Sequence, residues 1–150
     1  MGRGWELSTR PGPDVAIGDG TTYDESVRWG RSVSLGRNVH VGPGTVLHDG
    51  VAVGDDTWIG PDASLGEPTM GFYTKRESWV APPTVVGAGS ILRKGGIVGA
   101  GTTIGERFQS GPGVAIRERT RIGRNVSIGN GCDVQYDVEI GDFTRLHSLV

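Results

Sequence analysis

Three histidines are the side chains of this 150-residue chain best suited to acid–base chemistry: His40, His48 and His147. An imidazole titrates near neutral pH, so a histidine can take up or release a proton under physiological conditions. His147 is the leading candidate for a catalytic base, ahead of His48 and His40. The alternative for each of them is a solvent-exposed residue without a chemical role.

The basic residues and the cysteine suggest weaker sites. Seven basic side chains fall between residues 93 and 124, where they could bind phosphate groups. The favoured alternative is ion pairing between neighbouring turns, with Arg119 above Asp137 and Arg121 above Glu139. Cys132 is expected to point inward as a small apolar residue rather than to react. The three histidines share no common spacing, so we expect no metal site.

A six-residue period organises the elements that must position these side chains. From Val98 onward the first place of each six is aliphatic except at Ser110, the fifth is mostly small or β-branched except at Phe108, and the second is usually Gly. First and fifth places lie on one side of an extended chain, so together they fill a narrow interior. We expect Gly in the second place, and Gly or Asn in the fourth, to supply positive φ at the corners. Short strands separated by sharp corners predict an all-β solenoid, a β-helix with three sixes per turn.

The period also sets the expected boundaries. Residues 1–16 fit no repeat and are expected to form an N-terminal arm or cap, in which Trp5 either plugs the open end or lies in a loose tail. The β-helix is expected over residues 17–150, with a wide or capping first turn because Tyr23 and Trp29 are large. The period breaks at residues 66–85, which predicts one long protruding loop, and loops of this length are often functional.

The repeats, and the corner at residues 109–118 with the sequence Gln-Ser-Gly-Pro-Gly-Val-Ala-Ile-Arg-Glu, resemble the hexapeptide-repeat acyltransferases, and among them the sugar and sugar-nucleotide acetyltransferases. The resemblance covers most of the chain. It implies a left-handed parallel β-helix, a homotrimer, and a site in the groove between two subunits. It also implies acetyl-CoA as cosubstrate and a corner histidine as base, which takes a proton from an amino or hydroxyl group of the acceptor.

The resemblance also suggests site residues. The family commonly carries His where this chain has Pro112 and Gly113. His147 stands in the same column as Gly111, two turns or about 10 Å further along. That is too far to replace a base at residue 113 directly but close enough to line the same groove, and His147 is taken as the candidate base. The expected substrate contacts are Ser110, Arg117, Glu118, Trp79 and Tyr73. Trp58 and the loop are the expected subunit contacts, since exposed Trp is common at interfaces.

Two alternatives remain open, because Pro112 and Gly113 replace the usual histidine corner. The chain is then a non-catalytic scaffold or oligomerisation module, or it performs a different chemistry in the same groove. The formal net charge of −2 argues against a nucleic-acid partner. No apolar run approaches the roughly 20 residues of a membrane span, and residues 1–10 show no signal sequence, so we expect a cytoplasmic protein.

Overall fold

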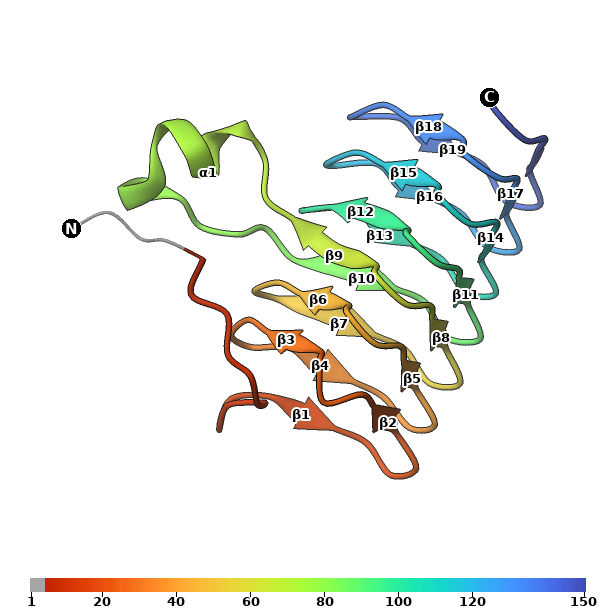
Figure 1. The fold of residues 1–150 in the computed structure, drawn as a ribbon. Coiled ribbons are helices and arrows are strands. Elements are labelled where there is room, and N and C mark those ends of the chain that lie inside the picture. The colour runs from red at the N-terminus through yellow and green to blue at the C-terminus, as the bar shows by residue number, and fades with distance from the viewer. Residues whose placement is uncertain (1–4) are drawn as a thin grey trace.

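The computed structural model describes residues 5–150, which form a parallel β-solenoid of stacked triangular turns (Figure 1). The first sheet contains Ala16–Ile17 (β1), Ser34–Leu35 (β4), Val51–Val53 (β7), Thr84–Val86 (β10), Thr103–Ile104 (β13), Arg121–Ile122 (β16) and Glu139–Ile140 (β19). The second contains Thr22–Tyr23 (β2), His40–Val41 (β5), Trp58–Ile59 (β8), Ile91–Leu92 (β11), Gln109–Ser110 (β14), Ser127–Ile128 (β17) and Arg145–Leu146 (β20). The third contains Arg28–Trp29 (β3), Val46–Leu47 (β6), Ser64–Glu67 (β9), Ile97–Gly99 (β12), Ala115–Ile116 (β15) and Asp133–Val134 (β18).

Each strand pairs in parallel with the third strand after it, so one turn takes three sixes. Leu35 pairs with Val53 and Ile104 with Ile122, in both cases 18 residues apart. Sheets of this kind, closed around one axis, are the all-β parallel solenoid that the period predicts, and the arrangement is consistent with a left-handed β-helix.

The interior is filled by first and fifth places, as expected. Leu47, Leu65 and Ile116 represent the first places and Val27 and Val39 the fifth, and all are fully buried. Fifth-place threonines satisfy their hydroxyls by donating to backbone carbonyls: Thr45 to Gly60, Thr102 to Arg117 and Thr120 to Gln135. Cys132 is also buried, as predicted, and its thiol donates to the carbonyl of His147.

The corners use glycine for two different reasons. Fourth places carry positive φ, for example 53° at Asn38 and 76° at Gly44. The expectation of positive φ in the second place is wrong for most turns, including Gly54. A Cβ on Gly54 would lie 2.6 Å from the backbone nitrogen of Ala88 in the next turn. Glycine stands there because the stacked corners approach too closely for a side chain.

One insertion leaves the solenoid between β9 and β10. Val53 pairs with Val86, 33 residues away instead of 18, so the insertion adds 15 residues to this turn. Because β9 extends to Glu67 and β10 begins at Thr84, the loop spans residues 68–83 rather than 66–85. We call residues 68–83 the strap. It contains the short helix Met70–Thr74 (α1) and a 3-10 turn, Arg76–Ser78, and no helix within residues 5–150 has the length and apolarity to span a membrane.

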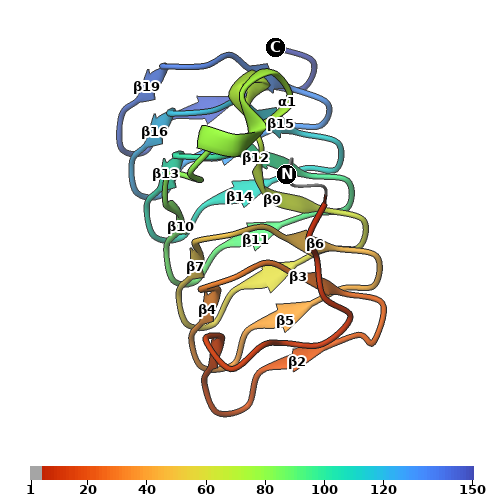
Figure 2. The ribbon, with the colours of Figure 1, turned by 90° about the vertical axis from the view of Figure 1, so that its left-hand side faces the viewer.

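The N-terminal arm, residues 5–14, runs along the outside of the first turns toward α1 (Figure 2). Ser8 forms an antiparallel bridge with Trp29. Trp5 does not plug the open end of the prism: its ring packs on Phe72 of the strap, with centroids 4.8 Å apart. At the open end Tyr23 stays exposed and packs edge-on against Trp29, which fills the interior. Residues 1–4 of the expected arm lie outside the described part.

Candidate active site

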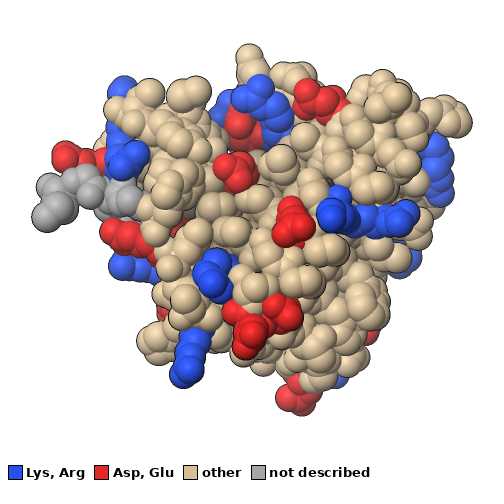
Figure 3. Space-filling view, viewed as in Figure 1, with Lys and Arg blue, Asp and Glu red and all other residues tan. Residues whose placement is uncertain are grey.

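The corner that follows the third sheet carries His48, Arg117, Glu118, Arg119 and Asp137, and the strap begins there. We call it the polar edge: the residues that follow β6, β9, β15 and β18, with the strap and the arm covering its middle (Figure 2). Acidic and basic side chains are interspersed on one face of the molecule (Figure 3). The polar edge is covered around His48 and exposed at Arg119 and Asp137.

Three polar groups meet where the strap begins. His48 follows β6, Ser64 lies in β9 on the adjacent turn, and Glu67 ends β9. The His48 Nε2 atom lies 3.1 Å from Ser64 Oγ, and Ser64 donates its proton to Glu67 Oε1 at 2.6 Å. Glu67 Oε1 is 3.8 Å from His48 Nε2, beyond hydrogen-bonding distance, so the serine connects the other two groups.

Aromatic residues of the arm and the strap bury this histidine. The ring centroid of Trp5 lies 6.3 Å from that of His48, and only 8% of His48 is exposed. A cavity of ≈ 40 Å³ beside it is lined by Trp5, His48, Asp49, Phe72, Arg76 and Trp79, among others. The alternative given for each histidine, a solvent-exposed residue, does not apply to His48.

Burial decides the charge of His48. Loss of hydration lowers its pKa, and the negative charges of Glu67 and Asp49 oppose this effect without overcoming it. A histidine whose pKa is lowered is neutral at neutral pH and is able to accept a proton. Burial, a hydrogen-bonded partner and a nearby carboxylate are the features of a general base.

Arg76 brings a positive charge to the same pocket. Its guanidinium lies over the Phe72 ring, 5.1 Å from the centroid. Its Nε atom is buried and has no hydrogen-bond partner within residues 5–150. An anionic or carbonyl oxygen of a ligand would satisfy that donor.

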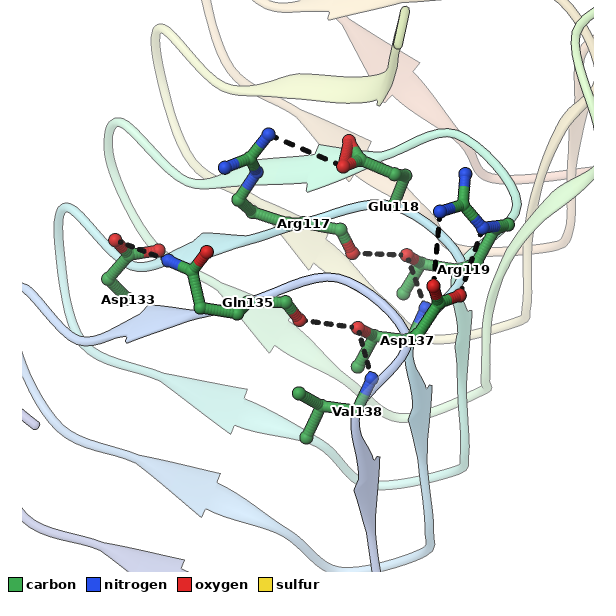
Figure 4. Close-up of polar contacts among 9 residues, drawn as sticks. Arg117, Glu118, Arg119, Asp133, Gln135, Asp137 and Val138 are labelled. Carbon is green, nitrogen blue, oxygen red and sulfur yellow. Dashed lines mark hydrogen bonds and ion pairs between the residues drawn. The ribbon is translucent and has the colours of Figure 1, made fainter.

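Further along the polar edge the side chains form a ladder (Figure 4). Arg119 binds Asp137 through two hydrogen bonds of 2.9 and 3.1 Å, which confirms the predicted stacking and lowers the pKa of Asp137. Arg117 pairs with Glu118 at 3.4 Å, and both arginines lie over the ring of Tyr136. Arg121 is in register with Glu139, as expected. This part of the edge is held by internal ion pairs.

The predicted site residues fall on two different edges. Tyr73 and Trp79 belong to the strap, and Arg117 and Glu118 belong to the polar edge that the strap covers in part. His147 is exposed and follows the second sheet, in the column of Gly111 as predicted. Within one chain, His147 is therefore separated from the strap residues.

Ser110 and the remaining candidates occupy other environments. Ser110 is buried, and its hydroxyl lies in the core with no hydrogen-bond partner among the described residues, so it does not face a groove. His40 stacks on the exposed Trp58 with ring centroids 4.2 Å apart, and its Nδ1 lies 2.7 Å from Thr22 Oγ1. In residues 5–150 no group of three or more His, Cys, Asp or Glu side chains is placed to hold a metal ion.

The sequence-based prediction missed Ser64, Glu67, Arg76 and the covering role of Trp5, and it ranked His48 below His147. One signal was available. Second places are usually Gly along the chain, and at this corner His48, Arg117 and Gln135 depart from that pattern. Of these three, His48 stands just before the turn that carries the insertion. The covering contacts join residues far apart in the chain and have no periodic signal.

Comparison with known proteins identifies solved structures that share the fold of this chain. No protein-family model matches the sequence, and no curated protein matches it significantly. Among solved structures, the UDP-N-acetylglucosamine acyltransferase of Campylobacter jejuni aligns with a TM-score of 0.53 and 12% identity, over 83% of this chain and 64% of that one. The Arabidopsis UDP-N-acetylglucosamine acyltransferase aligns with a TM-score of 0.51 and 17% identity, over 91% of this chain and 62% of that one.

At these identities the likeness shows a shared fold. The chain has the parallel β-helix fold that the resemblance to hexapeptide-repeat acyltransferases implied. It spans less than two thirds of the length of either structure.

Proposed function

We propose that this chain is the β-helix of an acyltransferase that moves an acyl group onto an amino or hydroxyl group of a sugar or sugar nucleotide. The observation that carries the proposal is His48: a buried histidine with a lowered pKa, linked to a carboxylate, in a walled pocket. The shared fold with two UDP-N-acetylglucosamine acyltransferases supports the reaction class.

The proposed reaction uses His48 as general base. The imidazole takes a proton from the hydroxyl or amino group of the acceptor. At the same time the oxygen or nitrogen of that acceptor group attacks the carbonyl carbon of an acyl thioester. The carbon–sulfur bond then breaks, and the leaving thiolate takes up the proton from the imidazolium. Arg76 lines the same pocket, and its guanidinium is the proposed partner of a negatively charged or carbonyl oxygen.

The finer assignments are also proposals. Acetyl-CoA is the proposed acyl donor, and a homotrimer is the proposed assembly, both from the sequence resemblance. Tyr73 and Trp79 are the proposed acceptor contacts, with Arg117 and Glu118 beyond them along the polar edge. His147 is the second candidate for the base; it follows the second sheet and would meet a strap only across a subunit boundary.

Calorimetric titration of the full-length protein with acetyl-CoA, on a sample whose mass in solution is known, tests this proposal. We expect a trimer mass and a dissociation constant between about 1 μM and 1 mM, the range common for enzyme substrates. A trimer that binds no acetyl-CoA would favour the alternatives, a scaffold or a different groove chemistry.

A further inference from the structure

The hydroxyl of Ser64 is the centre of the His48 site. It contacts His48 Nε2 at 3.1 Å on one side and Glu67 Oε1 at 2.6 Å on the other. A serine hydroxyl has one proton to donate and lone pairs to accept with. The short contact to the glutamate has the length of a charge-assisted O–H···O bond, so the proton of Ser64 lies on that side.

The position of this proton decides the tautomer of His48. Because Ser64 has no second proton, its oxygen must accept from the imidazole, and Nε2 of His48 carries a hydrogen. A neutral imidazole has one N–H and one bare nitrogen. When His48 is neutral, the nitrogen with a free lone pair is then Nδ1.

We infer that Ser64 is a positioning residue, through which Glu67 orients the ring of His48. In this orientation Nδ1 of His48 is the nitrogen that takes the proton from the amino or hydroxyl group of the sugar. The tautomer follows from the contacts alone, while the role of Nδ1 in transfer rests on the proposed function. The distance from Glu67 Oε1 to His48 Nε2 is 3.8 Å, too long for a hydrogen bond. The carboxylate therefore orients the imidazole through the Ser64 hydroxyl.

The charged groups around the ring fit this role. Glu67 from β9 and Asp49 beside the histidine stabilise the imidazolium that forms when a proton is taken up. Glu6 of the arm and Arg76 of the strap line the same pocket. Without Ser64 the imidazolium would lose its hydrogen-bond acceptor, and its pKa would fall further below the ordinary histidine value.

Nitrogen-15 NMR of the substrate-free, full-length protein tests the tautomer. With three histidines in the chain, the His48 signals are identified by their loss in His48→Gln. We expect the Nε2–H tautomer for neutral His48 in the wild type and in the control variant Ser127→Ala, which removes a serine at the equivalent outward place of β17. An Nδ1–H tautomer in the wild type would overturn the inference.

Transfer kinetics test the positioning role. We expect Ser64→Ala to lower kcat about ten- to a hundredfold with little change in KM, and to move the acid limb of the pH profile to lower pH. Ser64→Thr keeps the hydroxyl and should restore both. An unchanged acid limb in Ser64→Ala would contradict the role, because lost packing alone would not move it.

The two measurements separate this inference from the proposed function. If His48 is the Nε2–H tautomer but the protein transfers no acyl group, the proposed function is refuted, while the inferred hydrogen bond from His48 Nε2 to Ser64 still holds. Active transfer with an Nδ1–H tautomer would refute the inference and leave the function standing.

Discussion

At the scale of single residues, one hexad reverses the usual order of large and small. Phe108 takes a fifth place and is fully buried, and Ser110 takes the next first place beside it. Both side chains lie in the interior, so here a large fifth place precedes a small first place. The buried hydroxyl of Ser110 has no hydrogen-bond partner among the described residues. The departure at Ser110 that the sequence showed thus accompanies a large buried residue at Phe108.

This arrangement predicts that Ser110→Ala leaves stability unchanged or raises it by about 1 kcal/mol, because it removes an unsatisfied buried hydroxyl. Ser90 is the matched control, a buried serine whose hydroxyl donates to the Gly87 carbonyl at 2.7 Å. Ser90→Ala should lower the free energy of unfolding by about 1 kcal/mol. Urea unfolding of both variants measures the difference, and equal losses in the two would show that Ser110 has a partner.

His48 makes stability depend on pH. Its folded pKa lies below the ordinary value of about 6.5, so below that pH the unfolded chain binds a proton that the folded chain does not. The free energy of unfolding should fall as the pH drops from about 7 toward the folded pKa, by at most about 1.4 kcal/mol per pH unit. Urea unfolding of wild type and His48→Gln between pH 7 and 5 checks this; parallel curves would contradict it.

At the scale of elements, the arm and the strap cover His48 together. The ring of Trp5, from the N-terminal arm, packs against the rings of Phe72 and Tyr73 of the strap. The same ring lies beside the imidazole of His48. The strap has one buried residue in its helix, Phe72. The cover therefore depends on a few aromatic contacts rather than on a continuous core.

Removal of one of these contacts should raise the His48 pKa. We expect Trp5→Ala to hydrate the imidazole and to move its pKa toward the ordinary value, since burial is the main cause of the lowering. Trp58→Ala is the control, because Trp58 is 57% exposed and Trp5 55%, but Trp58 stacks on His40 instead. NMR titration of His48 reads the shift; the same titration curve in wild type and Trp5→Ala would refute this cover.

The period predicted the strands but not what lies outside them. First and fifth places were identified correctly because their burial repeats every six residues. The bounds of the strap were off by two residues at each end, since β9 runs to Glu67 and β10 begins at Thr84. The place of Trp5 and the reason for glycine in the second place depend on contacts between turns, which no local pattern contains.

At the scale of the whole molecule, the candidate site residues lie on different edges of the solenoid, and the fold of a single chain does not bring them together. The polar edge carries His48, the strap and the Arg119–Asp137 ladder, while His147 follows the second sheet. The sequence predicted the fold class because every turn repeats it. It did not predict the His48 site, because Trp5, His48 and residues 67–72 come from three separate parts of the chain.

The role of His48 as the base is tested by the release of free thiol from acetyl-CoA in the presence of a panel of amino and hydroxy sugars and their nucleotide forms. Wild type, His48→Gln and His147→Ala are compared after their folding is verified by circular dichroism. We expect His48→Gln to lower turnover by about 10²–10⁴-fold and His147→Ala to leave turnover close to that of the wild type. Loss of turnover in His147→Ala with activity retained in His48→Gln would contradict the role of His48 as the base.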